Sequence, residues 1–246
     1  MFYEDTIAAI ATASVNGGVS IIRISGENAV KVADSCLKLK NKTLAEVKSH
    51  TIHYGYVVDE EGQKIDEVLV LLMRTPNSYT REDVVEIQCH GGAFVCQTIL
   101  DLILKKEGVR IAEPGEFTKR AFLNGRIDLS QAESVIDVIN SKNEFALKSS
   151  LSQLSGSVSE KIKEIRGTVL HEIAFIESAL DDPEHISLDG YPEKLSGIVS
   201  DVIKKIDKLL ANSDNGKMLK EGISTVIVGK PNAGKSSLLN SLVGEE

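Results

Sequence analysis

The sequence lacks several features that would assign it to a special class of protein. Its 246 residues contain no tryptophan, five prolines and three cysteines, and aromatic residues make up only 4%. No apolar run is long enough to cross a bilayer, and the first residues lack the basic start of a secretory signal peptide. Three cysteines are an odd number without disulfide-like spacing. We therefore expect a reducing, cytoplasmic setting and no membrane association.

Positive charge is also in short supply. Lysine and arginine number 28 against 36 aspartates and glutamates, which gives a net charge of −8. This balance argues against a broad nucleic-acid-binding surface, although it leaves room for a local basic patch. The hydrophobic content of 42% and the charged content of 26% are normal for a globular protein. The length suffices for one large domain or two ordinary ones.

The first part of the chain mixes strand and helix patterns. Two amphipathic stretches, 27–37 and 93–105, predict helices. Short β-branched runs bounded by turn residues predict strands, and the third and fourth of them should form a hairpin around 59–62. These strands are expected at 5–11, 18–26, 50–58, 68–73 and 84–89. Together the elements indicate an α+β domain over residues 1–120.

After Pro114 the periodicity becomes helical. Helices are predicted at 117–123 and 128–139, and apolar residues then recur in steps of three and four from Leu151 to Leu180. That stripe predicts one extended helix. Another helix should start near Pro192 and break at 212–216. Antiparallel helices of this kind predict half of an α-helical bundle over residues 121–216.

Residues 229–236, GKPNAGKS, match the phosphate-binding P-loop pattern G-x-x-x-x-G-K-[ST]. The run Ile223–Val228 predicts a buried strand before the loop, and 237–242 predict a helix after it. Backbone N–H groups at that helix N-terminus would face phosphates. Lys235 would reach the β- and γ-phosphates, and the Ser236 hydroxyl would bind Mg²⁺. An ordinary glycine-rich turn is the alternative, and the flanking strand and helix patterns argue against it.

The segment 222–246 is interpreted as the start of an α/β P-loop domain, because the sequence ends ten residues after Ser236. The N-K-x-D motif that recognises guanine is absent, so the residues by themselves do not distinguish GTP from ATP as the bound nucleotide. Only Lys235 and Ser236 of the parts that phosphoryl transfer needs are present. We therefore expect this chain by itself to hydrolyse little or no GTP, and we assign no catalytic residue.

Several separate stretches, in the right order, resemble the MnmE (TrmE) family of tRNA-modifying GTPases. They are GVSIIRISG at 18–26, NSYTREDVVE at 77–86, HGG at 90–92, PGEF at 114–117, RAFLNGRIDL at 120–129, QAE at 131–133 and GKPNAGKSSLLN at 229–240. The resemblance covers the whole chain. One departure is Arg81, which stands where the family pattern SYTGED has glycine.

The resemblance implies an N-terminal domain that dimerises and binds 5-formyl-tetrahydrofolate, a helical domain, and a Ras-like GTPase domain. It implies GTP hydrolysis with Mg²⁺ and K⁺, and a heterotetramer with the FAD-dependent partner MnmG (GidA). The substrate would be tRNA, whose wobble uridine U34 receives a 5-carboxymethylaminomethyl group. A tRNA modification GTPase is the leading hypothesis. The alternative is a folate-binding, dimerising scaffold with an incomplete, inactive P-loop domain.

Three folate-binding residues follow from the resemblance, namely Arg23, Glu86 and Arg126. Taken alone, each has an equally good structural explanation, such as a strand arginine on the solvent face. Glu86 lies between Val85 and Ile87, where a carboxylate is costly unless it has a partner. A pterin edge offers the paired N–H donors that would suit it.

The resemblance also implies that GTP contacts Asn232, Ala233, Gly234, Lys235, Ser236 and Ser237, with Mg²⁺ on Ser236 and K⁺ on Asn232. Without it, Asn232 is simply a turn asparagine. The neighbours Cys89 and His90 are set aside as a metal or nucleophile site, because a lone pair supplies neither a ligand set nor an orienting third group. His171 and Glu172 are expected to be solvated on their helix.

Overall fold

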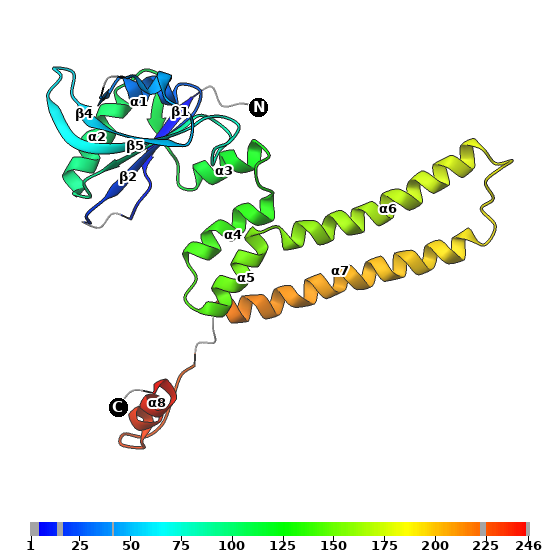
Figure 1. The fold of residues 1–246 in the computed structure, drawn as a ribbon. Helices are drawn as coiled ribbons and strands as arrows, with labels where there is room; N and C mark the ends of the chain where they lie inside the picture. The colour runs from blue at the N-terminus through cyan, green and yellow to red at the C-terminus, as the bar shows by residue number, and fades with distance from the viewer. Residues whose placement is uncertain (1–4, 14–16, 41, 222–224, 245–246) are drawn as a thin grey trace. The chain divides into compact units, whose positions relative to one another are not determined.

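A computed structural model describes residues 5–13, 17–40, 42–221 and 225–244, with side chains described up to 211 and again from 225. The contacts divide the chain into two compact units, Met1–Ile136 and Asp137–Glu246. Figure 1 shows a sheet-based first unit and a helical second unit.

In the described part of the first unit, seven strands form one mixed sheet in the order β3-β4-β5-β6-β2-β1-β7. β1 and β7 are parallel, and every other neighbouring pair is antiparallel. The strands are β1 (Thr6–Ile10), β2 (Ser20–Ser25), β3 (Leu37–Leu39), β4 (Thr51–Val58), β5 (Lys64–Met73), β6 (Val84–Cys89) and β7 (Val109–Ile111). The five predicted strands and the β4–β5 hairpin are confirmed. β3 and β7 were not predicted, because three residues are too few to show an alternating pattern.

Two helices, α1 (Ala29–Asp34) and α2 (Ala93–Leu104), cover one face of this sheet. Alternate strand residues point into the core that they form, for example Ile22, Val70 and Ile87, which are fully buried. The helix predicted over 27–37 is shorter than expected. Leu37 is not part of this helix, because it is the first residue of β3 and its backbone pairs with that of Val57.

Two further helices follow the sheet, α3 (Glu116–Leu123) and α4 (Leu129–Ile139), and one 3₁₀ turn, η1 (Leu44–Glu46), precedes β4. The helices predicted at 117–123 and 128–139 are therefore confirmed. α3 begins after Gly115, whose φ of 76° lies in the left-handed region that glycine adopts without strain.

The second unit contains α5 (Glu144–Leu154), α6 (Ser157–Asp181), α7 (Tyr191–Glu221) and α8 (Lys235–Val243). The prediction of one continuous helix across 151–180 is wrong. The chain leaves the helical path at Gly156, whose φ is 94°, so that α5 and α6 are separate. The predicted break at 212–216 is also wrong, because α7 continues through these residues. The low helix propensity of single residues costs too little free energy to interrupt a long helix.

The long helices α6 and α7 run antiparallel beside each other, as the bundle prediction requires (Figure 1). The Tyr191 hydroxyl near the start of α7 donates to the Glu172 carboxylate on α6 at 2.8 Å. Glu172 is therefore buried, not solvated as expected. None of the described helices is both long and apolar enough to cross a membrane.

The predicted strand before the P-loop is not present in the residues that the structure describes. Residues 225–229 have no regular secondary structure, and Val226 and Val228 are 80% and 84% exposed. Ile223 and Ser224 lie outside the described residues. A strand needs a neighbour for its backbone hydrogen bonds, and the described part of the second unit contains no strand. The predicted helix after the loop is confirmed as α8.

Candidate functional sites

The sheet face opposite α1 and α2 carries the first candidate site. One row across it joins Arg23 of β2, Glu86 of β6 and Leu71 of β5, because residues directly opposite in register share a face. Apolar side chains surround this row, and several are exposed in spite of their size. Ile52, Tyr54 and Leu69 are 59%, 45% and 43% exposed. The first unit therefore presents an apolar, uncovered sheet face around a charged pair.

Arg23 and Glu86 form an ion pair on this face. Arg23 Nε donates to Glu86 Oε1 at 2.8 Å, and Nη2 lies 2.7 Å from the same oxygen. A carboxylate between the apolar residues Val85 and Ile87 needs a partner, and Arg23 is that partner for Glu86. Both contacts end on Oε1, and the hydrogen bonds among the described residues do not include Oε2. The carboxylate therefore keeps an acceptor for a ligand N–H.

The Tyr79 ring brings Arg126 to the same place as Arg23. The Arg126 guanidinium carbon lies 4.8 Å from the centre of the Tyr79 ring. The Arg23 guanidinium carbon lies 5.3 Å from Tyr79 and 5.4 Å from Phe117. Cations over ring faces at such distances are attracted to them. The structure therefore gathers Arg23, Glu86 and Arg126 into one cluster with Tyr79 and Phe117, called the aromatic–arginine cluster below.

Sequence reasoning missed the two rings of the aromatic–arginine cluster. Tyr79 lies in the 77–86 stretch and Phe117 in the 114–117 stretch that carry the family resemblance, and this is the only signal that could have found them. The cluster combines a free carboxylate oxygen, two guanidinium groups and two ring faces. Guanidinium forks bind carboxylates in bidentate fashion, and ring faces stack on planar heterocycles. Its chemistry fits a flat, N–H-bearing ligand with an anionic group.

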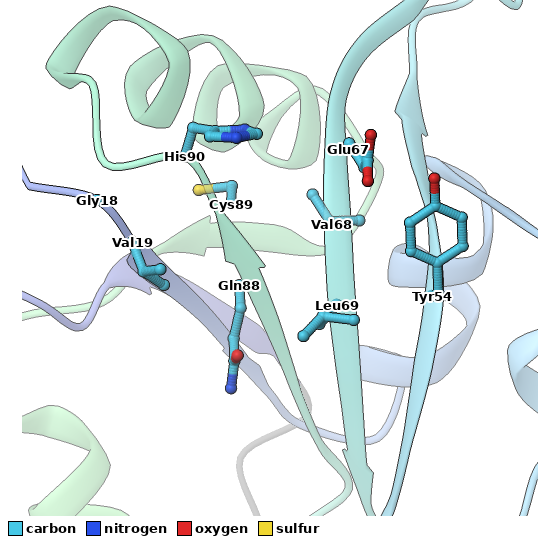
Figure 2. Close-up of a pocket in the computed structure, with 9 residues that line it drawn as sticks. All are labelled: Gly18, Val19, Tyr54, Glu67, Val68, Leu69, Gln88, Cys89 and His90. Carbon is cyan, nitrogen blue, oxygen red and sulfur yellow. The ribbon is translucent and has the colours of Figure 1, made fainter.

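A shallow cavity of about 320 Å³ lies on the same sheet face (Figure 2). It contains none of the three predicted residues, but Gln88 in its wall follows Glu86 by two positions on β6, about 7 Å along the strand. Its volume is at the lower end for small-molecule sites. Its lining residues are Gly18, Val19, Tyr54, Glu67, Val68, Leu69, Gln88, Cys89 and His90.

Cys89 and His90 do not form a reactive pair in this cavity. Burial raises the pKa of the Cys89 thiol to about 12, so the thiol stays protonated. The His90 ring is instead held by Asp66, with Nδ1 2.6 Å from Oδ1. Among the described residues, no three His, Cys, Asp or Glu side chains gather in a way that would hold a metal ion.

Arg81 adopts a backbone conformation that explains why glycine is expected there. Its φ is 60°, in the left-handed region, which costs a residue with a Cβ about 1–2 kcal/mol. Its Nη1 donates to the Asn124 carbonyl oxygen at 3.0 Å, in the turn just before Arg126. The arginine thus reaches the edge of the aromatic–arginine cluster.

The P-loop residues form the second candidate site. Gly234, with φ of 83°, caps α8, and Asn232 has φ of 59°, a conformation that asparagine tolerates better than most residues. Lys235 Nζ donates to the carbonyl oxygens of Gly229 at 3.0 Å and Lys230 at 2.6 Å. The loop thus wraps around the lysine ammonium. Ser236 lies in the first turn of α8 beside Lys235.

Comparisons with known proteins cover nearly the whole chain. Residues 6–126 match the family described as GTP-binding protein TrmE N-terminus, and residues 129–241 match the MnmE helical domain. The chain is 60% identical to tRNA modification GTPase MnmE of Lachnoclostridium phytofermentans and 55% identical to that of Clostridioides difficile. A third such protein, from Bacillus velezensis, is 50% identical. These alignments cover 98–100% of this chain but 53% of each relative, so the chain spans about half the length of the curated relatives it matches.

Proposed function

The chain belongs to the MnmE (TrmE) family of tRNA modification GTPases, and we propose that it acts in the modification of the wobble uridine U34 of tRNA. In this proposal 5-formyl-tetrahydrofolate supplies the one-carbon unit for a 5-carboxymethylaminomethyl group, and GTP is bound and hydrolysed. The domains would be a folate-binding, dimerising domain at 1–120, the first half of a helical domain at 121–216 and the start of a GTPase domain at 222–246.

The aromatic–arginine cluster is the observation that carries this proposal. Glu86 Oε2 would accept from an N–H donor of the pterin edge, while Arg23 holds the same carboxylate through Oε1. Arg126, whose guanidinium lies on Tyr79, binds a carboxylate of the glutamate tail. Removing one charged hydrogen-bonding partner should cost about 1.5–3 kcal/mol, or about tenfold to a hundredfold in affinity.

The P-loop would hold the triphosphate of GTP with Mg²⁺. Residues Asn232 to Ser237 would surround the phosphates, Lys235 would contact the β- and γ-oxygens, and the Ser236 hydroxyl would bind the metal. When bound, Mg²⁺ neutralises the charge that develops on the phosphates. Asn232 would contribute to a K⁺ site.

A second copy of this chain would cover the uncovered sheet face. The exposed apolar residues Ile52, Tyr54 and Leu69 support this assignment, since such patches mark interaction sites. The further partners are tRNA and the FAD-dependent protein MnmG, in a heterotetramer in the cytoplasm. The second candidate function is a folate-binding scaffold whose P-loop is inactive. The bonds of Lys235 Nζ to the carbonyl oxygens of Gly229 and Lys230 favour it, because the ammonium is then engaged by its own loop.

Calorimetry with 5-formyl-tetrahydrofolate tests the folate site. Wild type should bind, and Arg23→Ala, Glu86→Ala and Arg126→Ala should each weaken binding about tenfold or more. Arg166→Ala, which removes an exposed arginine from α6, is the matched control and should bind as wild type does. If wild type does not bind the folate, or if all three variants bind it equally well, the site assignment is wrong.

Nucleotide titrations separate the two candidate functions. The GTPase proposal expects GTP to bind, and Lys235→Ala to abolish that binding. Folate binding without any GTP binding would support the scaffold instead.

A further inference from the structure

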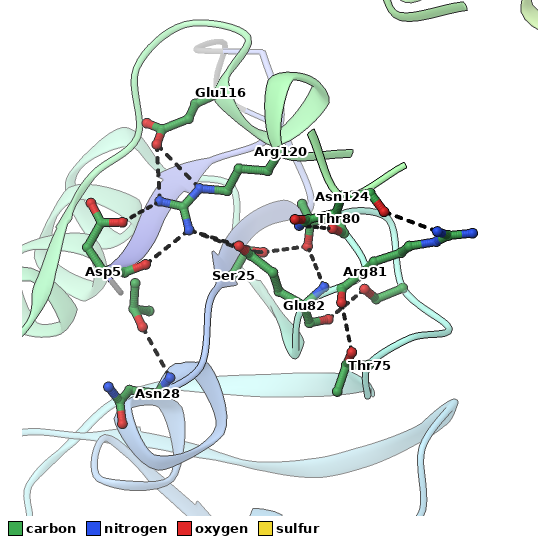
Figure 3. A network of polar contacts seen from close by, with 12 residues as sticks. Asp5, Ser25, Asn28, Thr75, Thr80, Arg81, Glu82, Glu116, Arg120 and Asn124 are labelled. Atoms are coloured by element: carbon green, nitrogen blue, oxygen red, sulfur yellow. Dashed lines mark hydrogen bonds and ion pairs between the residues drawn. The ribbon is translucent and has the colours of Figure 1, made fainter. Parts of the chain in front are cut away.

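A continuous polar network joins the segments that carry the aromatic–arginine cluster (Figure 3). At its centre is Arg120 of α3, whose side chain is fully buried. It donates to Asp5 Oδ1 at 2.8 Å, to Glu82 Oε1 at 3.2 Å and to Glu116 Oε1 at 3.1 Å. One guanidinium thus connects α3 to the start of β1 and to the loop between β5 and β6.

The loop of residues 74–83 is fastened to β2 through Glu82 and Thr80. The Ser25 hydroxyl at the end of β2 donates to Glu82 Oε2 at 2.7 Å and lies 2.7 Å from the Thr80 hydroxyl. Ser25 and Thr80 are fully buried. Hydrogen bonds in such a low-dielectric setting are strong and directional, so they hold the loop in one place relative to β2.

The same loop is fastened to α3 by two further bonds. Asn124 Nδ2, at the C-terminal end of α3, donates to the Thr80 carbonyl oxygen at 2.7 Å. The Tyr79 hydroxyl lies 2.9 Å from the Thr118 hydroxyl. The loop has neither helix nor strand, and it therefore depends on these contacts for its position.

Each member of the cluster except Glu86 sits on a segment that this network connects. Arg23 is on β2, Tyr79 is in the loop, Phe117 is on α3, and Arg126 follows α3 by three residues. The Tyr79 ring makes cation–π contacts with the guanidinium groups of both Arg23 and Arg126. Its place between them is consequently set by how the loop is held against β2 and α3.

We propose that Arg120 and Glu82 are positioning residues of the folate site: they hold the 74–83 loop so that the Tyr79 ring presents Arg23 and Arg126 to one ligand. The part of this proposal that concerns affinity rests on the proposed folate function. The part that concerns the position of Tyr79 does not. A role in stability alone would leave the ring and the ligand affinity unchanged in any variant that still folds.

The test uses Glu82→Gln in the whole chain, because glutamine keeps the shape of the side chain and removes its charge. Asp34→Asn is the matched control. Its carboxylate, like that of Glu82, accepts a hydrogen bond, here from the backbone N–H of Leu44, but it lies on α1, on the covered side of the sheet. Thr118→Val, which removes only the hydroxyl that meets Tyr79, is the second variant if Glu82→Gln fails to fold.

The first measurement needs no ligand. Guanidinium Nε–Hε protons over a ring face are shifted upfield in the NMR spectrum, so those of Arg23 and Arg126 report the position of Tyr79. We expect the upfield shifts in wild type and Asp34→Asn, and their loss in Glu82→Gln and Thr118→Val. Shifts that persist in the folded Glu82→Gln variant would overturn the proposal.

The second measurement is the affinity for 5-formyl-tetrahydrofolate. Glu82→Gln should weaken binding about tenfold, and Asp34→Asn should not change it. In a Tyr79→Leu background, Glu82→Gln should add no further loss, since it acts through that ring. Additive losses, or unchanged affinity in Glu82→Gln, would overturn the positioning role. If wild type binds no folate, the proposed function fails, and the NMR shifts alone decide the position of Tyr79.

Discussion

Glu116→Gln should make the stability of the first unit less sensitive to acid. The Glu116 side chain is 3% exposed. Arg110 donates to its two oxygens, from Nη2 to Oε1 at 2.6 Å and from Nη1 to Oε2 at 2.8 Å. The backbone N–H of Glu113 and the Arg120 guanidinium add further bonds. Arg110 foremost, helped by these donors, lowers the Glu116 pKa from 4.5 to about 2.

The size of the effect follows from this pKa. At about 1.4 kcal/mol per unit, the shift corresponds to about 3 kcal/mol. Arg110 is 40% exposed, so solvent screens part of the interaction, and we expect about 2 kcal/mol. A lowered pKa contributes stability above the unfolded value of about 4.5, and the contribution is lost as the pH falls toward 2. Less than about 1 kcal/mol of it should be gone by pH 4.

Thiol labelling during urea unfolding measures the unfolding free energy of the first unit alone. All three cysteines lie in that unit, and all are buried: Cys36, Cys89 and Cys96. The reagent 4,4′-dithiodipyridine reacts with thiols in acid as well as at neutral pH. Glu116→Gln should be less stable than wild type by about 2 kcal/mol at pH 7, and the difference should shrink steadily below pH 4.5.

The exposed carboxylate of Glu107 supplies the control. Glu107→Gln should follow the wild-type stability at every pH. A difference between Glu116→Gln and wild type that stays constant from pH 7 to pH 3 would refute the reasoning, because Glu116 would then contribute by shape and hydrogen bonding and not through its ionised form.

Two further pairs of substitutions test backbone conformations. Arg81→Gly should destabilise the first unit less than Arg81→Ala, because both lose the bond to the Asn124 carbonyl but only alanine keeps the left-handed strain of about 1 kcal/mol; equal urea midpoints would contradict this. In the second unit, Gly156→Ala should lower the unfolding free energy by about 1 kcal/mol because its φ is 94°. Gly167→Ala, inside α6 with open space around it, should raise that free energy by about 0.5–1 kcal/mol. Circular dichroism in urea compares the pair, and a common sign for both changes would rule out the conformational explanation.

Local patterns in the sequence were enough to predict most elements and the turn of the P-loop. The alternation of apolar residues predicted β1, β2, β4, β5 and β6. Successive side chains of a strand point to opposite faces, so its pattern can be recognised from neighbouring residues. The P-loop pattern at 229–236 predicted the turn and the start of α8 in the same way. Arg23, Glu86 and Arg126 came from the family resemblance, and the residues alone left their roles open.

Positions where several segments compete were decided by the tertiary structure. Leu37 fits a helix pattern but pairs with Val57 in β3, and Glu172 fits a solvated helix face but is buried against Tyr191. The apolar stripe across 151–180 continues through the bend at Gly156, since a stripe records which side is buried and not whether the helix is unbroken.

The aromatic–arginine cluster shows the same division. The sequence by itself determined which residue types were available: a carboxylate within an apolar strand, arginines in two distant segments, and the motif stretches that contain Tyr79. Only the tertiary structure decided that Arg23 meets Glu86, 63 residues away, and that Tyr79 lies over both guanidinium groups. Strand register and the contacts of the 74–83 loop determine these two side-chain contacts. Register and loop contacts both depend on hydrogen bonds between distant segments, which a local sequence pattern does not reveal.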